Sequence, residues 1–184
     1  RLIQAMSGKA HRINVIMPIL YGGRQHRRNY RESLDCAVAL QELQAMSVEN
    51  VICFDAHDAR VCNAIPLMGF DNVMPSYQVL KTMFRNVKDL NITPKTFMVV
   101  SPDEGAMHRN MYYASVLGVD LGMFYKRRDY SRIINGRNPI VAHEYLGNSV
   151  EGKDVFISDD IISSGDSMLD IAYELKKRKA KRII

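Results

Sequence analysis

The sequence predicts an α/β protein whose sheets are mostly parallel. Short apolar runs recur along the chain with helical patterns between most of them, at residues 13–19, 51–54, 97–100, 121–125 and 155–157. This alternation is typical of a parallel sheet with helices on both faces. Three of the runs lead directly into acidic residues. Because open parallel sheets bind ligands at the carboxyl ends of their strands, we expect these residues to converge on one sheet rim.

Helices are predicted where apolar residues recur at helical spacing. The four candidate faces are Leu34, Val38 and Leu40; Val79, Leu80, Met83, Phe84 and Val87; Met107, Met111, Ala114 and Leu117; and Met168, Ile171, Ala172 and Leu175. Residues 1–10 are typical of the end of an amphipathic helix, and 181–184 of the beginning of a strand. A polar connection at 91–95 contains a turn residue. We therefore expect a partial N-terminal domain at 1–90 and a truncated C-terminal domain at 91–184.

Composition excludes several classes of protein. The 184 residues are 47% hydrophobic, which is enough for an ordinary core. No apolar run approaches the roughly 20 residues that a membrane helix needs, and no signal peptide is recognisable, so a cytoplasmic protein without a membrane partner is expected. Three cysteines without CxxC spacing argue against a disulfide framework or a zinc site. The net charge of +5 is a mild excess and does not indicate nucleic-acid binding.

The most informative stretch is 155–167, where a predicted strand leads through an acidic pair and a loop of small residues into a helix. Backbone amides of such a loop and the positive end of the helix dipole together favour a bound phosphate. Neighbouring side chains on a strand leave opposite faces, so we expect Asp159 and Asp160 to accept sugar hydroxyls or act as outer magnesium ligands, without sharing a proton. The alternative is a plain helix N-cap, which Ser163, Ser164, Asp166 and Ser167 would all suit.

Two further strand ends carry groups that can bind a metal. Asp55 and His57 follow the run 51–54, and Asp103 follows the run 97–100. Taken singly, each is more often a hydrogen-bonded loop residue than a ligand. Together they suit an oxygen-preferring ion such as Mg²⁺, held mainly through water and substrate phosphate, since zinc would require more nitrogen or sulfur.

Basic residues cluster after two of the predicted strands. The segment 24–31 is rich in arginine, and Lys126, Arg127 and Arg128 directly follow the run 121–125. Both clusters are open to a plain interpretation as solvated surface. However, the arginine fork matches phosphate oxygens in pairs, and three like charges at a strand end repel by about 1 kcal/mol per pair at 4 Å even in water. These clusters therefore also suit a phosphate-bearing ligand.

These motifs together resemble one enzyme family. Arg24 and Gln25 followed by basic residues, the Asp55–His57 triplet, Ser101-Pro102-Asp103 with Gly105 and Arg109, Lys126 with Arg128, and the 159–167 loop occur in the order and approximate spacing of ribose-phosphate pyrophosphokinase. The resemblance covers nearly the whole chain. It implies two domains of the type I phosphoribosyltransferase fold in a subunit and a homo-oligomer built on dimers, a hexamer in the family. It also implies transfer of the diphosphoryl group of ATP to the C1 hydroxyl of ribose 5-phosphate with Mg²⁺.

The resemblance also implies a role for each matching residue. Arg24 and Gln25 would bind ATP, and His57 and Asp103 would hold the metal. Lys126 would stabilise negative charge on the transferred group, with Arg128 beside it as a second catalytic and phosphate-binding cation. The ribose 5-phosphate would lie against Asp159, Asp160, Ser163, Ser164, Gly165, Asp166 and Ser167.

The chain departs from the family pattern in this loop. Ser163 and Ser164 stand where an acid and a threonine are usual, and Asp166 stands where the family has glycine or alanine. A carboxylate beside a phosphate weakens binding unless it faces away. A catalytically weak or silent paralogue that assembles with active subunits is therefore an alternative. A third hypothesis is a phosphoribosyltransferase acting on a base, but it gives no role to Arg24, Gln25 or His57.

Overall fold

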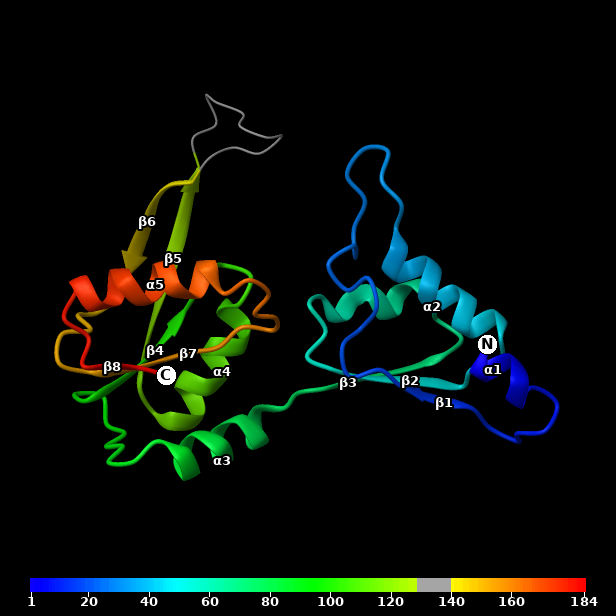
Figure 1. Cartoon of the computed structure of the whole chain (residues 1–184), viewed down its shortest axis with the longest axis horizontal. Coiled ribbons are helices and arrows are strands. Elements are labelled where there is room, and N and C mark those ends of the chain that lie inside the picture. The colour runs from blue at the N-terminus through cyan, green and yellow to red at the C-terminus, as the bar shows by residue number, and fades with distance from the viewer. Residues whose placement is uncertain (129–139) are drawn as a thin grey trace. The chain divides into compact units, whose positions relative to one another are not determined.

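The protein is described by a computed structural model that covers residues 1–128 and 140–184, and the side chains of 126–143 are not described. The chain forms two compact units, Arg1–Lys81 and Thr82–Ile184. Figure 1 labels the helices and strands of both units. The domain boundary expected between residues 90 and 91 stays a prediction. No helix among the described residues is long and apolar enough to cross a membrane.

The first unit is built on a small parallel sheet. Its elements are α1 (Leu2–Met6), β1 (Asn14–Ile16), α2 (Asp35–Ala45), β2 (Asn50–Phe54), the 3₁₀ helix η1 (Ala59–Ala64) and β3 (Gly69–Val73), and α3 (Ser76–Asn86) spans its boundary with the second unit. The strands pair in the order β1-β2-β3, both pairs parallel. β2 is thus the central strand of this sheet.

The core of the first unit lies on one face of this sheet. Val51 and Cys53 are both 0% exposed and alternate along β2, as expected for side chains that share a strand face. They pack with Cys36 and Leu40 of α2 and with Val61 of η1. Figure 1 shows α2 and η1 on the same side of the strands.

The second unit contains a five-stranded mixed sheet. Its remaining elements are β4 (Phe97–Ser101), α4 (Met107–Leu117), β5 (Asp120–Arg128), β6 (Ile140–Leu146), β7 (Asp154–Ile157), α5 (Asp166–Lys177) and β8 (Arg182–Ile183). The strand order is β6-β5-β4-β7-β8, and every pair is parallel except β5 with β6. The predicted α/β class with mostly parallel sheets is confirmed.

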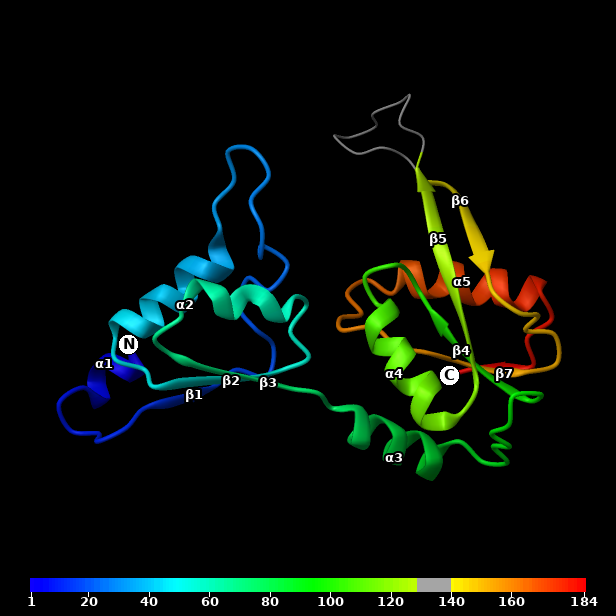
Figure 2. The ribbon, with the colours of Figure 1, turned by 180° about the vertical axis from the view of Figure 1, so that it is seen from behind.

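Helices cover both faces of this second sheet. Val155 packs in one cluster with Ile171 and Leu175 of α5. The next residue, Phe156, meets the ring of Tyr113 of α4 edge-on, with 5.2 Å between ring centroids. Because successive strand residues point to opposite faces, α5 and α4 lie on opposite sides of β7, as Figure 2 shows from behind.

Several predicted buried positions are wrong. In α4 the buried residues are Asn110, Tyr113 and Ala114, whereas Met111 is 49% exposed. Val38 and Phe84 are likewise exposed. Strand β3, with the sequence Gly-Phe-Asp-Asn-Val, was not predicted because its polar residues interrupt the apolar run by which the other strands were recognised. The three cysteines are free thiols.

Gly122 of β5 provides a test of this packing. A methyl group added there would lie 2.9 Å from two ring carbons of Tyr145. The ring is held because its hydroxyl donates to the Asn148 carbonyl at 2.8 Å. Gly122→Ala should therefore lower the free energy of unfolding by about 1–3 kcal/mol, and Tm by roughly 2–4 °C per kcal/mol. Thermal and urea denaturation would measure both.

The matched control is the same substitution in a Tyr145→Ala background. The three atoms nearest to the new methyl all belong to Tyr145, so without the ring the additional cost of Gly122→Ala should fall sharply. An equal cost in both backgrounds would contradict this account of the packing.

Candidate functional site

Two acidic turns meet at one edge of the second sheet. β4 and β7 are parallel neighbours in register, from Phe97 opposite Asp154 to Val100 opposite Ile157. Their carboxyl ends therefore lie side by side, and the turns that follow carry Asp103 and Asp159. The expectation that strand-end acids converge is confirmed for this pair.

The expectation that all the strand-end residues converge on one sheet rim is wrong for Asp55 and His57. These residues follow β2, which pairs with β1 and β3 in the other sheet. The run 51–54 supplies an apolar strand but does not specify which strands flank it. The two groups of site residues therefore belong to two separate sheet rims.

The turn after β4 is held by its own side chains. The hydroxyl of Ser101, which is 0% exposed, donates to the carbonyl of Asp103 at 2.8 Å. The carboxylate of Asp103 accepts the backbone N–H of Ala106 at 3.1 Å, directly before α4 begins. Side-chain to backbone bonds of this kind favour turns and helix starts over continued regular structure. The carboxylate of Asp103 is thus held in place at the rim.

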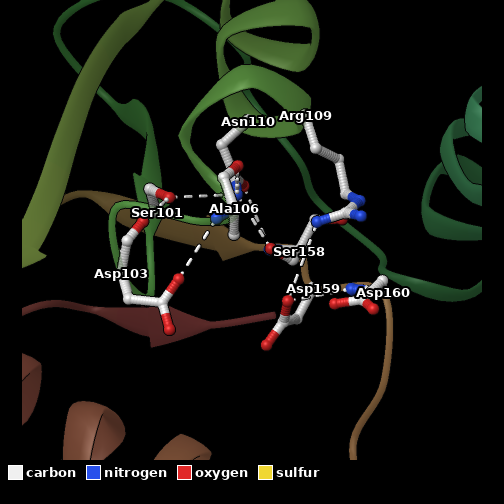
Figure 3. A network of polar contacts seen from close by, with 8 residues as sticks. All are labelled: Ser101, Asp103, Ala106, Arg109, Asn110, Ser158, Asp159 and Asp160. Atoms are coloured by element: carbon white, nitrogen blue, oxygen red, sulfur yellow. Dashed lines mark hydrogen bonds and ion pairs between the residues drawn. The ribbon is translucent and has the colours of Figure 1, made fainter. Parts of the chain in front are cut away.

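Asp159 and Asp160 form a contacting pair, which corrects the expectation that they face apart. β7 ends at Ile157, so both acids lie beyond the strand whose alternation would have separated them. The N–H of Asp160 donates to Oδ1 of Asp159 at 2.9 Å. Burial raises the pKa of Asp159 to about 6, and the side-chain hydrogen bond with Asp160 and the charges of Asp160 and Asp103 add to that shift. Figure 3 shows the carboxylates of Asp103 and Asp159 directed to the same side, away from Asn110.

Arg109 of α4 supplies a cation to this group. Its Nη1 lies 3.7 Å from Oδ1 of Asp159, and its side chain is only 10% exposed. At that distance burial outweighs its attraction, since the pKa of Asp159 is still raised. One guanidinium does not fully neutralise the charge of these carboxylates. They are therefore suited to accepting hydrogen bonds from hydroxyl groups or to binding a hard cation. Among the described residues, however, no three potential ligands are grouped closely enough to hold a metal by themselves.

The turn that follows leads into α5 through a left-handed glycine. Gly165 has φ +87°, and its carbonyl accepts the N–H of Leu169 at 2.9 Å, so the helix starts there. The cap position is Gly165 and carries no side-chain cap hydrogen bond. The hydroxyl of Ser164 accepts the N–H of Asp166 at 3.4 Å. The serines do not form the side-chain N-cap of the alternative interpretation, while Ser163, Ser164, Asp166 and Ser167 are all exposed.

The first unit has its own polar cluster beside β2. Asp58 is the N-cap of η1, and both of its carboxylate oxygens accept from the side chain of Arg60, at 2.8 and 2.6 Å. These hydrogen bonds hold the pKa of Asp58 well below its ordinary value. Nε2 of His26 lies 3.5 Å from the same carboxylate, and the rings of His26 and His57 are 5.2 Å apart between centroids.

A cavity of about 380 Å³ adjoins this cluster. It is lined by His26, Arg27, Asp58, Arg60 and Val61. Asp55, where β2 ends, has φ +45°, a left-handed conformation that costs about 1–3 kcal/mol in a non-glycine residue. Its N–H donates to the carbonyl of Val73 at 3.1 Å, which helps to hold it there. The sharp turn directs the chain away from the sheet toward His57 and Asp58.

The structure describes the remaining predicted site residues only in part. Arg24 and Gln25 are exposed in the loop before α2, and the carbonyl of Gln25 accepts the N–H of Cys36 at 3.4 Å. The backbones of Lys126 and Arg128 belong to β5, but their side chains lie outside the described residues. Their catalytic roles stay predictions, as does the metal-binding role of His57 and Asp103.

Sequence reasoning missed Asn110 and the His26–Asp58–Arg60 cluster, and it noted Ser101 only as part of a motif. Asn110 interrupts an apolar helix face, and a polar residue at such a position signals a buried hydrogen-bond network. The other contacts connect residues whose proximity has no sequence pattern. Arg109 was noted only as part of a motif, without a role.

Comparisons with known proteins identify the class of protein to which this site belongs. The family model of the phosphoribosyl transferase domain matches residues 70–184, and the chain belongs to that family. Within it, the resemblance to ribose-phosphate pyrophosphokinases is confirmed. The chain is 31% identical over 181 residues to the enzyme of that name from Ralstonia nicotianae, covering 95% of this chain and 51% of the relative. The chain is also 31% identical over 192 residues to the ribose-phosphate pyrophosphokinase from Vibrio cholerae, and this match covers 99% of this chain and 55% of the relative.

A solved structure shares the fold. The phosphoribosylpyrophosphate synthetase from Mycobacterium smegmatis matches with a TM-score of 0.83 at 22% identity, covering 99% of this chain and 55% of that one. This likeness shows the phosphoribosyltransferase fold. The chain spans about half the length of the curated relatives it matches.

The raised pKa of Asp159 makes stability depend on pH. A carboxyl with a folded-state pKa of about 6 and an ordinary value of 3.8 favours folding below pH 4, and this contribution is lost as the pH rises toward 6. Asp159→Asn cannot ionise, so between pH 4 and 7 it should gain about 2 kcal/mol of stability relative to the unmodified protein. Urea unfolding across that range measures the difference.

Asp170→Asn is the control, because it removes the same charge from an exposed position on α5. It should show no comparable gain between pH 4 and 7. A constant difference between Asp159→Asn and the unmodified protein over this range would contradict the raised pKa.

Proposed function

We propose that the chain provides the reaction of a ribose-phosphate diphosphokinase. The diphosphoryl group of ATP is transferred to the C1 hydroxyl of ribose 5-phosphate, giving phosphoribosyl pyrophosphate and AMP. Support comes from relatives named ribose-phosphate pyrophosphokinase that cover 95–99% of this chain. Because the chain spans about half of their length, the substrates and activity of a whole enzyme are part of the proposal.

One observation carries the proposal: a pair of contacting acids at the sheet rim is followed by a left-handed turn into a helix. Asp159 and Asp160 would accept the ribose hydroxyls, which are hydrogen-bond donors. The turn through Gly165 would bring backbone amides and the N-terminus of α5 to the 5-phosphate. This arrangement is matched to a phosphorylated pentose, with the sugar and phosphate ends recognised by different chemistry.

Magnesium is part of this proposal, with Asp103 and His57, which follow strands of different sheets, as the candidate ligands. The carboxylate of Asp103 is an oxygen ligand of the kind that Mg²⁺ prefers, and His57 would act chiefly through bound water. When bound, the ion would neutralise charge on the triphosphate.

The basic residues complete the proposal. Arg24 and Gln25 would hold ATP, and Lys126 with Arg128 would stabilise the charge that develops on the transferred group. Positioning and charge stabilisation dominate phosphoryl-type transfer, so no protein nucleophile is needed. A dimer-based homo-oligomer and a cytoplasmic location also belong to this proposal.

The assay is AMP release from ATP and ribose 5-phosphate. The protein should form AMP and phosphoribosyl pyrophosphate in equal amounts, and chelation of magnesium should abolish both. Lys126→Ala should lower kcat by about 10²–10³, the usual cost of one charge-stabilising group. Lys181→Ala, which removes an exposed cation before β8, is the control and should leave the rate unchanged. AMP formation no greater than background would reject the proposal.

Asp166 favours the silent-paralogue alternative. It is exposed in the first turn of α5, where its charge opposes a bound phosphate. Asp166→Ala should lower KM for ribose 5-phosphate by about fivefold, corresponding to about 1 kcal/mol of repulsion. If both forms are inactive alone but copurify with an active synthetase, the alternative is supported and catalysis by this chain is rejected.

A further inference from the structure

A single buried amide links the two acidic turns of the second unit. Asn110 of α4 is 0% exposed. Its Nδ2 donates to the carbonyls of Ser158, at 2.8 Å, and Ala106, at 2.9 Å, and lies 3.4 Å from the hydroxyl of Ser101. Its Oδ1 accepts the N–H of Ser158 at 3.2 Å. Figure 3 shows Asn110 between the two turns.

On one side, Asn110 replaces a missing strand partner. The pairing of β4 with β7 ends at Val100 and Ile157, so the backbone groups of Ser158 have no further partner in that ladder. Asn110 satisfies both the N–H and the carbonyl of this residue. Buried backbone groups need such partners, and loss of one weakens the structure around it. Ser158 directly precedes Asp159, so the amide fixes the point at which the acidic pair leaves the sheet.

On the other side, Asn110 contacts the residues that hold Asp103. Ser101 donates its hydroxyl to the carbonyl of Asp103, and Ala106 donates its N–H to the carboxylate of Asp103. The side-chain amide of Asn110 contacts both of these residues, at the hydroxyl of Ser101 and at the carbonyl of Ala106. The turns that carry Asp103 and Asp159 therefore share one side chain as a common support.

We infer that Asn110 is a positioning residue, which sets the spacing between Asp103 and the Asp159–Asp160 pair for binding of the pentose. The inference rests on the proposed function, in which Asp159 and Asp160 accept the ribose hydroxyls. Asn110 does not touch the substrate. Its effect is on KM for ribose 5-phosphate, because a shift of the acids by a fraction of an ångström weakens their hydrogen bonds to the sugar.

The experiment compares two substitutions in α4. Asn110→Leu has similar volume but leaves both backbone groups of Ser158 unpaired. Hydrogen exchange should become at least tenfold faster at the amides of Ser158 and Asp160 and stay unchanged in β4. KM for ribose 5-phosphate should rise about tenfold while KM for ATP is unchanged. The control, Tyr113→Leu, removes a buried ring that packs on Phe156.

The outcomes separate positioning from plain stability. If Tyr113→Leu lowers Tm as much as Asn110→Leu and raises KM equally, Asn110 only supports packing and the inference is overturned. Unchanged exchange at Ser158 in Asn110→Leu overturns it too. Should that variant not fold, Asn110→Asp has the same shape and keeps an acceptor for the Ser158 N–H, but its carboxylate repels the carbonyls of Ser158 and Ala106. This repulsion should loosen the turn, and faster exchange at the amide of Asp160 is expected. An inactive parent protein rejects the proposed function, and the exchange result still decides whether Asn110 positions the turn.

Discussion

The parallel pairing of β4 with β7 is the constraint on which the candidate site depends. Both strands are mostly apolar and mostly buried, so their register is set chiefly by the core and not by Asp103 and Asp159. That register brings the ends of the two strands to one edge and forces Asp103 and Asp159 into proximity. A slip by one residue would move the side chains of a whole strand to the other face.

The electrostatic character of the rim is a consequence of this geometry. Carboxylates that would be fully ionised in water are gathered where burial raises the pKa of Asp159. Arg109 offsets part of the charge but lies 3.7 Å away. A cluster of partly buried carboxylates is tolerated when a bound ligand compensates its charge. Carboxyls with perturbed pKa values at a strand end are therefore typical of a ligand site. The acidic rim is thus more consistent with binding than with structural stabilisation.

Much of this architecture was predictable from the sequence. The runs 97–100 and 155–157 became the buried strands β4 and β7, and the buried residues Ile171 and Leu175 belong to the face predicted for α5. β3 was missed because pairing with β2, not its own polar residues, makes it a strand. Asn110 was missed because its partner, Ser158, is distant in sequence. The contact between Asp159 and Asp160 depends on the residue at which β7 stops, and periodicity does not define element ends that finely.

The topology also determines the order in which a growing chain can complete its parts. The three strands of the first unit are consecutive in sequence, so its sheet can assemble as soon as residue 73 has been synthesised. In the second unit, β4 can pair with β5 first, but its other neighbour, β7, comes only after β5 and β6. Arg182 then binds Asp154 and the carbonyls of Lys88 and Asp89, joining the last strand to the connection before β4. During translation a nascent chain therefore lacks the acidic rim until synthesis has passed β7.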